Sequence, residues 1–226
     1  MKFFIDTADL DEIREAESWG VLSGVTTNPS LYARTGGKLA DFEDHMVKIC
    51  HICEGLPVSA ESQAKTTEDM VADARRLSKL APNIVVKLPI CEEALTACHT
   101  VAAEGIRVNM TLVFSPTQAL LAANAGARYI SPFVGRFDDI AEDGIEQLAN
   151  VVEVIQNYDW DKNVDHKVEI ITASVRTPNH ITQAALLGAD IATVPFAALK
   201  KAVKHPLTDQ GRASFDRDWQ KVLDAQ

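Results

Sequence analysis

The sequence has little positive charge, few cysteines and no long apolar run, and each shortage excludes a class of protein. Its 226 residues include 22 lysines and arginines against 32 aspartates and glutamates, which gives a formal net charge of −10. So acidic a chain is unsuited to non-specific binding of nucleic acid or of acidic membranes. No apolar stretch approaches the length of a membrane span, so no membrane partner is expected. Any anionic ligand must therefore be held by a local cluster of arginines.

Cysteine is scarce, and the four that occur do not form a disulfide framework. They are Cys50, Cys53, Cys91 and Cys98. Together with an N-terminal apolar run that is too short for a secretion signal, they predict a protein of the reduced cytoplasm. The pair Cys50 and Cys53 resembles half of a metal site, but no second pair of ligands follows at a useful spacing. We interpret these thiols as buried structural side chains and expect no metal.

Apolar strand patterns and amphipathic helix patterns alternate along the whole chain, which predicts an α/β protein. Gly105, Gly126 and Gly188 each lie between a helix and the next strand, where glycine supplies a left-handed helix cap. The pattern indicates a single (β/α)8 TIM barrel over residues 1–226. A doubly wound open sheet is the alternative, but no phosphate-binding glycine motif follows the first strand. The expected strands span residues 2–6, 24–27, 56–60, 84–89, 107–112, 129–133, 167–172 and 191–194.

Two segments exceed what a barrel needs. Residues 213–224 predict an extra amphipathic helix with Phe215, Trp219 and Val222 on one side. Because a barrel already has eight helices, this helix packs either on a neighbouring subunit or on its own barrel, and we expect a homo-oligomer. Residues 157–166, rich in Asp and Asn, form a longer loop than the fold requires, and the sequence assigns them no function.

A single lysine interrupts the most apolar expected strand. Lys87 follows three β-branched residues, Ile84, Val85 and Val86, and precedes the strand-ending Pro89. Lysine is rarely buried without a reason, because removing the ammonium from water is costly. A free lysine has a pKa of ~10.4, and burial generally lowers that value and frees the lone pair for attack on a carbonyl. The alternative is a lysine that reaches solvent or pairs with a carboxylate.

The functional groups of this fold lie at the C-terminal ends of the strands. Seven expected strands end in polar side chains, whereas the eighth, ending at Val194 and Pro195, presents nothing obviously polar. A purely structural rim has no need of so many polar groups, so we interpret their convergence as a site. The rim residues are Asp6, Thr26, Asn28, Glu61, Lys87, Asn109, Thr111, Ser131, Phe133, Arg136, Thr172, Ser174 and Arg176.

These residue types suit carbonyl chemistry on a phosphorylated sugar. Lys87 can add to a ketone and hold it as an iminium, while Asp6 takes and returns a hydroxyl proton. Glu61 with Thr111 can orient a water molecule. Taken singly, Asp6 could cap a helix, Glu61 could pair with Lys87, and the arginines could be surface residues. A phosphate group would be held by Arg136, Ser174 and Arg176.

Four segments of the chain carry a family resemblance. They are Gly-Val-Thr-Thr-Asn-Pro-Ser at 24–30, Val-Val-Lys-Leu-Pro at 85–89, Thr-Leu-Val-Phe-Ser at 111–115 and Ser-Pro-Phe-Val-Gly-Arg at 131–136. They resemble the transaldolase family in its small single-barrel branch, which is close to the fructose-6-phosphate aldolases, and the likeness covers nearly the whole chain. It implies Schiff-base transfer of a dihydroxyacetone unit from sedoheptulose 7-phosphate or fructose 6-phosphate to glyceraldehyde 3-phosphate or erythrose 4-phosphate, in the pentose phosphate pathway. It implies no cofactor or metal, and a homo-oligomer of five subunits or of ten.

The resemblance also implies a role for each rim residue. Lys87 would form the Schiff base, Asp6 would act as acid and base, and Glu61 with Thr111 would hold the catalytic water. Asn28 and Asn109 would contact the dihydroxyacetone portion of the substrate. The substrate-binding set would be Thr26, Asn28, Asn109, Ser131, Phe133, Arg136, Ser174 and Arg176, with the last three on the phosphate.

Two positions divide the family. The resemblance implies that the transferases carry glutamate and phenylalanine where the aldolases, which release free dihydroxyacetone, carry glutamine and tyrosine. This chain has Glu61 and Phe133, so we predict a transferase, with the aldolase and a non-catalytic sugar-phosphate-binding barrel as alternatives. The chain departs from the family at Cys91, usually a hydroxyl residue, and at Ala94, usually glycine. Both departures bear on local loop geometry.

Overall fold

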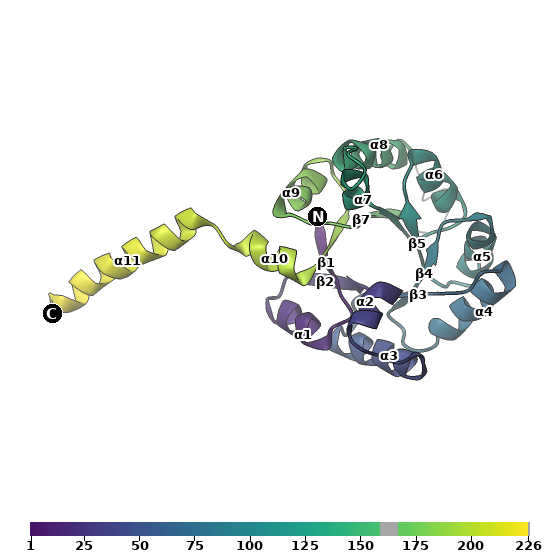
Figure 1. Ribbon diagram of the computed structural model, residues 1–226, viewed down its shortest axis with the longest axis horizontal. Coiled ribbons are helices and arrows are strands. Elements are labelled where there is room, and N and C mark those ends of the chain that lie inside the picture. Colours follow the sequence, from purple (N-terminus) through teal and green to yellow (C-terminus); the bar gives the residue numbers. More distant parts are fainter. Residues whose placement is uncertain (159–166, 226) are drawn as a thin grey trace.

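Eight parallel strands close into a barrel in the order of the sequence (Figure 1). The computed structural model describes residues 1–158 and 167–225. Each strand pairs in parallel with the next, and the last pairs with the first. This confirms the predicted (β/α)8 TIM barrel. The strands are β1 (Lys2–Asp6), β2 (Leu22–Thr26), β3 (Val58–Glu61), β4 (Ile84–Pro89), β5 (Val108–Val113), β6 (Tyr129–Pro132), β7 (Glu169–Thr172) and β8 (Ile191–Val194).

Helices surround the barrel between successive strands (Figure 1). Asp9, Thr66, Ser115 and Thr177 begin four of them, each with a side chain that accepts backbone N–H groups. The predicted glycine caps all have positive φ angles. The longer helices are α1 (Leu10–Ser18), α3 (Phe42–Ile52), α4 (Thr67–Leu77), α5 (Glu92–Ala102), α6 (Pro116–Asn124), α8 (Gly144–Gln156), α9 (Pro178–Leu186) and α10 (Phe196–Val203).

Two short helices were not expected from the sequence. They are α2 (Pro29–Arg34) and α7 (Val134–Asp138). Each is too short to show the 3.6-residue apolar period that reveals a helix in a sequence. They follow the C-terminal ends of β2 and β6, where the polar rim lies. The helix expected over residues 39–52 is present as the 3₁₀ turn η1 (Leu39–Asp41) followed by α3.

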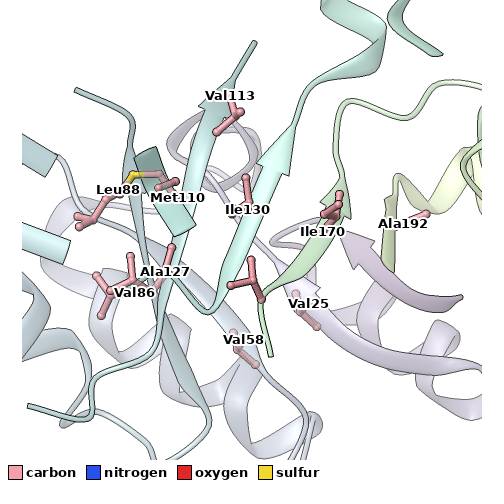
Figure 2. Packing of buried hydrophobic residues seen from close by; sticks show 14 of the residues in the cluster. Val25, Val58, Val86, Leu88, Met110, Val113, Ala127, Ile130, Ile170 and Ala192 are labelled. Carbon is pink, nitrogen blue, oxygen red and sulfur yellow. The ribbon is translucent and has the colours of Figure 1, made fainter. Parts of the chain in front are cut away.

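Alternate residues of β1, β4, β6, β7 and β8 face two separate apolar regions. The larger region lies between the barrel and its helices and includes Val86, Leu88 and Met110 (Figure 2). The smaller fills the barrel interior and consists of Phe4, Val85, Tyr129, Ile171 and Ile191. Because strand side chains alternate with a period of two, the residue two positions after each interior residue also faces inward. The apolar interior therefore supports a second inward-facing layer nearer the C-terminal rim.

The thiols at 50, 53 and 98 lie in the outer apolar region, as expected for structural cysteines. Burial raises the pKa of Cys50 to about 11 and that of Cys53 to about 12. Among the described residues, no three His, Cys, Asp or Glu side chains lie close enough to hold a metal ion. No helix in the described part of the chain is long and apolar enough to cross a membrane.

The C-terminal helix α11 (Pro206–Asp224) extends away from the barrel (Figure 1). It begins earlier than the expected range of 213–224, because His205 caps it and Pro206 occupies its first position. None of its described residues is buried, and Leu207, Phe215 and Trp219 are exposed. Of the long loop at 157–166, the structure describes Asn157, which ends α8, and Tyr158; residues 159–166 lie outside the described residues.

Candidate active site

A cavity of about 470 Å³ opens at the C-terminal ends of the strands. Its floor is the inward-facing layer above the apolar interior of the barrel. In β4, for example, Val85 belongs to the apolar interior and Lys87, two residues later, lines the cavity. Of the predicted site residues, those that line it are Asp6, Thr26, Asn28, Glu61, Lys87, Thr111, Ser131, Phe133, Arg136 and Ser174.

Lys87 is buried beside a carboxylate at the base of this cavity. Only 4% of the residue is exposed. Its Nζ lies 3.0 Å from Oε2 of Glu61, the residue opposite it on β3, and donates a hydrogen bond of 3.1 Å to the carbonyl of Thr27. The pairing considered as an alternative is therefore present. It places a proton acceptor within direct reach of the ammonium, which must lose a proton before it can attack a carbonyl.

Asp6 faces the same cavity from β1. Burial raises its pKa above the ordinary value, opposed by the positive charge of Lys87 and by a hydrogen bond from Thr26. The Thr26 hydroxyl donates to Oδ1 of Asp6 over 2.7 Å. The charge of Glu61 adds to the rise and that of Arg34 opposes it. A carboxyl with a raised pKa can both take and return a proton nearer neutral pH than a solvated aspartate.

Thr111 has a hydroxyl without a hydrogen-bond partner among the described residues, although the residue is only 1% exposed. Buried hydroxyls are normally paired, so an unpaired one that lines a cavity is suited to hold a ligand or a water. The strand is irregular here, with its register shifted between Met110 and Val113 and Leu112 at a φ of 57°. Ser174, which also lines the cavity, has a φ of 58°. Strained backbone of this kind concentrates at functional sites.

Three residues assigned to the rim, Thr172, Asn109 and Arg176, do not line the cavity. Thr172 follows Ile171 of the barrel interior, so strand alternation turns its side chain to the outer face. The expectation that it presents a group at the rim is therefore wrong. Asn109 is fully buried behind the lining: it accepts a hydrogen bond of 2.7 Å from Ser131 and donates one of 3.1 Å to Ser59. The structure thus places Asn109 where it orients the Ser131 hydroxyl.

The phosphate-binding candidates lie along one side of the rim. Arg136 makes no salt bridge with a described residue, and its guanidinium stacks over Phe133 at 5.9 Å from the ring centre. Arg176 instead pairs through both terminal nitrogens with Asp139, whose pKa it lowers. The Arg176 side chain passes so close to Gly135 that a Cβ there would lie 2.6 Å from its Nε. Arg176 therefore crosses the start of α7, and an anion at its guanidinium must compete with Asp139.

The side chains of Asn28 and Cys91 each cap the helix that follows. Asn28 accepts a hydrogen bond of 2.9 Å from the backbone N–H of Leu31 and so begins α2. Cys91 begins α5, where its sulfur accepts from the N–H of Ala94 at 3.4 Å. A thiol therefore serves as the helix cap at a position where the resemblance implies a hydroxyl residue.

Sequence reasoning missed three polar residues of the cavity, Ser30, Arg34 and Thr193. Arg34 is the last residue of α2, a helix too short to be detected. Thr193 belongs to β8, from which nothing polar was expected. Strand alternation from Ile191, an interior residue, was the signal that could have found it.

Comparison with known proteins agrees with this geometry. Residues 3–226 match the family described as transaldolase/fructose-6-phosphate aldolase. A probable transaldolase from Thermus thermophilus is 55% identical over 228 residues, which cover 98% of this chain and 99% of that protein. Probable transaldolases from Mesorhizobium japonicum and Caldicellulosiruptor saccharolyticus are 52% and 51% identical, and each alignment covers 98% of both chains. The chain therefore belongs to the transaldolase/fructose-6-phosphate aldolase family.

Proposed function

We propose that the protein is a transaldolase that carries a dihydroxyacetone unit on Lys87 as a Schiff base. The observation that carries the proposal is a lysine buried at the floor of a polar cavity, with the Glu61 carboxylate 3.0 Å from its ammonium and Asp6 in the same lining. Burying an ammonium is costly, and a chemical role for the lysine explains why the fold retains it there. The names of the relatives support the same activity.

Formation of the Schiff base requires three proton movements. Lys87 gives a proton to Glu61, and its lone pair then adds to the C2 carbonyl of the ketose phosphate. The adduct nitrogen loses a second proton and the alkoxide oxygen gains one, which gives the neutral carbinolamine. The carbinolamine hydroxyl takes the proton held by Glu61 and leaves as water, while the nitrogen lone pair forms the C=N bond of the iminium. Glu61 and the unpaired hydroxyl of Thr111 are placed to hold that water and to relay its protons.

Cleavage and transfer then depend on Asp6. Its carboxylate takes the proton of the C4 hydroxyl, the C3–C4 bond breaks, and the bond's electron pair moves into the iminium to give an enamine. The aldose phosphate leaves with a new aldehyde at the former C4. In the second half, the enamine carbon attacks the acceptor aldehyde, and Asp6 returns its proton to the new alkoxide. The raised pKa of Asp6 suits it to both transfers.

The phosphate of either sugar would lie against Arg136, Ser174 and Arg176. Arg136 makes no salt bridge with a described residue, which leaves its guanidinium available for a planar, two-point contact. Arg176 would also bind the phosphate, either by releasing Asp139 or by contacting both anions at once. Asn28 and Ser131 line the cavity, and we assign Asn28 to the dihydroxyacetone portion, with Asn109 acting through Ser131.

We favour transfer over release of free dihydroxyacetone because of Glu61 and Phe133. A carboxylate at 61 both orients a water and accepts its proton, whereas an amide could only orient it. Phe133 packs against Phe114, with the two ring centres 5.8 Å apart, and offers no hydroxyl to the cavity. The enamine is then not readily protonated and waits for an aldehyde.

The test supplies fructose 6-phosphate with and without erythrose 4-phosphate and follows the release of glyceraldehyde 3-phosphate. A transaldolase releases about one equivalent per site without acceptor and turns over only when acceptor is present. Equal steady-state release in both reactions would establish the fructose-6-phosphate aldolase instead. No release in either reaction would leave the non-catalytic binding protein.

We further propose a homo-oligomer, pentamer or decamer, assembled with the help of α11, and a location in the cytoplasm. The exposed Leu207, Phe215 and Trp219 support a helix that packs on another copy. The four free thiols suit a reducing compartment. Light scattering on a chain truncated after Leu207 tests the assembly. An unchanged number of subunits per particle would show that α11 does not hold the subunits together.

A further inference from the structure

β8 contributes one hydroxyl to the cavity, that of Thr193. This hydroxyl does not contact Asp6 directly but is linked to it through Thr26. Thr193 is 2% exposed and lines the cavity. Its Oγ1 lies 2.5 Å from Oγ1 of Thr26, whose hydroxyl in turn reaches Oδ1 of Asp6 over 2.7 Å. Three side chains from three adjacent strands, β8, β2 and β1, thus form one continuous hydrogen-bonded chain.

The number of protons determines the direction of this chain. A threonine hydroxyl has one proton to donate. The carboxylate of Asp6 is a stronger acceptor than a neutral hydroxyl, so the proton of Thr26 goes to Asp6. The short contact between the two threonines is then a hydrogen bond only if Thr193 donates to Thr26. Thr193 makes no other side-chain hydrogen bond with the described residues, so its proton is available for this contact.

The two oxygens of Asp6 consequently differ. Oδ1 accepts from Thr26, and no hydrogen bond from the described part of the chain reaches Oδ2. Asp6 lines the cavity, so Oδ2 is the oxygen with lone pairs left for the substrate. A proton taken from a substrate hydroxyl is directed to Oδ2 as long as Oδ1 is occupied by a donor.

We propose that Thr193 is a positioning residue that acts through Thr26 to keep Oδ1 of Asp6 hydrogen-bonded, so that Oδ2 exchanges the proton with the substrate. The inference rests on the proposed function, in which Asp6 is the acid and base. It adds β8 to the site as the strand that polarises Thr26.

Charged groups from three other elements face Asp6, and they define what Thr193 adds. Lys87 on β4 and Arg34 on α2 favour the carboxylate, Glu61 on β3 disfavours it, and burial disfavours it most. A hydroxyl that receives a hydrogen bond becomes a better donor, because hydrogen bonds in a chain polarise one another. Thr193 therefore strengthens the contact that holds down the pKa of Asp6, and its removal raises that pKa further.

The experiment compares Thr193→Val with Thr193→Ser in the full chain, measuring kcat from pH 5 to 9 with fructose 6-phosphate and erythrose 4-phosphate. In Thr193→Val the acidic limb of the profile moves up by about half a pH unit to one unit, which corresponds to one lost hydrogen bond. KM stays within about twofold, because Thr193 is assigned no contact with substrate. Thr193→Ser keeps the hydroxyl and restores the normal limb. If Thr193→Val does not fold, Thr193→Ala carries the same expectation.

A double variant tests whether the effect passes through Thr26. Thr26→Val shifts the acidic limb further than Thr193→Val, and adding Thr193→Val to it produces no extra shift. An unmoved limb in Thr193→Val, an equal shift in Thr193→Ser, or additive shifts in the double variant would each overturn the role of Thr193. The proposed function fails separately, if the unmodified protein neither turns over nor forms an adduct on Lys87.

Discussion

The two ends of the barrel bury carboxylates in opposite ways. Where the strands begin, Glu169 is 4% exposed and accepts from Lys2 at 2.6 Å and from Arg128 at 3.2 Å. Asp190 beside it accepts from Lys167 at 2.6 Å. Each buried or partly buried carboxylate at this end therefore has at least one cation of its own, and the cations reach solvent.

Where the strands end, carboxylates outnumber the cations that face them. Asp6 and Glu61 face one buried ammonium, that of Lys87, and burial raises the pKa of Asp6. The Thr111 hydroxyl nearby has no partner among residues 1–158 and 167–225. One end thus satisfies its charges, whereas the other retains groups that can still move protons and bind a ligand. The difference supports the proposal that the N-terminal end stabilises the barrel and the C-terminal end carries the chemistry.

Replacing one lysine at each end of the barrel is expected to give the largest difference in activity between the two ends. Lys87→Arg is expected to lower kcat by about a thousandfold or more, because a guanidinium stays protonated and cannot add to a carbonyl. The matched control, Lys2→Arg, keeps its charge beside Glu169 and is expected to retain full activity. Steady-state turnover and thermal melts of both variants check this, and more than a few per cent of activity in Lys87→Arg contradicts it.

The arginines of the two ends provide the next largest contrast. Arg136→Ala is expected to weaken the binding of phosphorylated substrates by about 2–5 kcal/mol and to affect non-phosphorylated ones far less. Arg176→Ala acts in the same direction. Arg128→Ala, at the other end, removes a partner of the buried Glu169 and should lower the melting temperature while leaving KM unchanged. Equal losses with phosphorylated and non-phosphorylated substrates would mean that Arg136 has a structural role.

Two unpaired threonines allow a smaller and more selective test. Thr111 and Thr172 both bury hydroxyls without partners in the described part of the chain, but Thr111 lines the cavity and Thr172 faces the helices. Valine in either place removes an unsatisfied group and should raise the melting temperature slightly. Only Thr111→Val is expected to lower kcat, by roughly 10- to 100-fold. A comparable kcat loss in Thr172→Val would show that the effect comes from packing.

The smallest expected effect concerns stability and pH. The pKa of Asp6 is higher in the folded protein than in an unfolded chain, so ionising it destabilises the fold. This loss is absent below the unfolded pKa, develops as the pH rises through the folded pKa, and is complete above it. Asp6→Asn should therefore raise the melting temperature at pH 8, by about 2–4 °C for each kcal/mol of unfolding free energy gained when the buried charge is removed. The same variant is expected to abolish turnover. Calorimetry should find the gain shrinking toward pH 4; a gain that grows there would reverse the sign of the argument.

Much of this site could be predicted from local sequence. The apolar run from Ile84 to Val86 located a buried strand, and Lys87 stood out because its type conflicts with that environment. Asp6 and Glu61 followed from their positions at the ends of expected strands. Such features depend on neighbours a few residues away, which a sequence displays directly.

The remainder depends on how distant segments meet. Thr26 and Thr193 are 167 residues apart, and their contact exists only because β8 closes the barrel against β1. Thr172 was assigned to the wrong face because a short apolar strand does not show which of its two alternating sets of side chains faces the barrel interior. The pairing of Arg176 with Asp139 likewise requires the unexpected helix α7.

The central claim is that Lys87 forms the covalent intermediate, and borohydride trapping tests it most directly. The protein is incubated with fructose 6-phosphate, reduced with borohydride, digested and mapped by mass spectrometry, with Lys87→Arg in parallel. Reduction of an iminium leaves a stable secondary amine on the lysine that formed it. The account predicts one dihydroxyacetone-derived adduct, on Lys87, and none in Lys87→Arg. An adduct on another lysine, or turnover without any adduct, would contradict it.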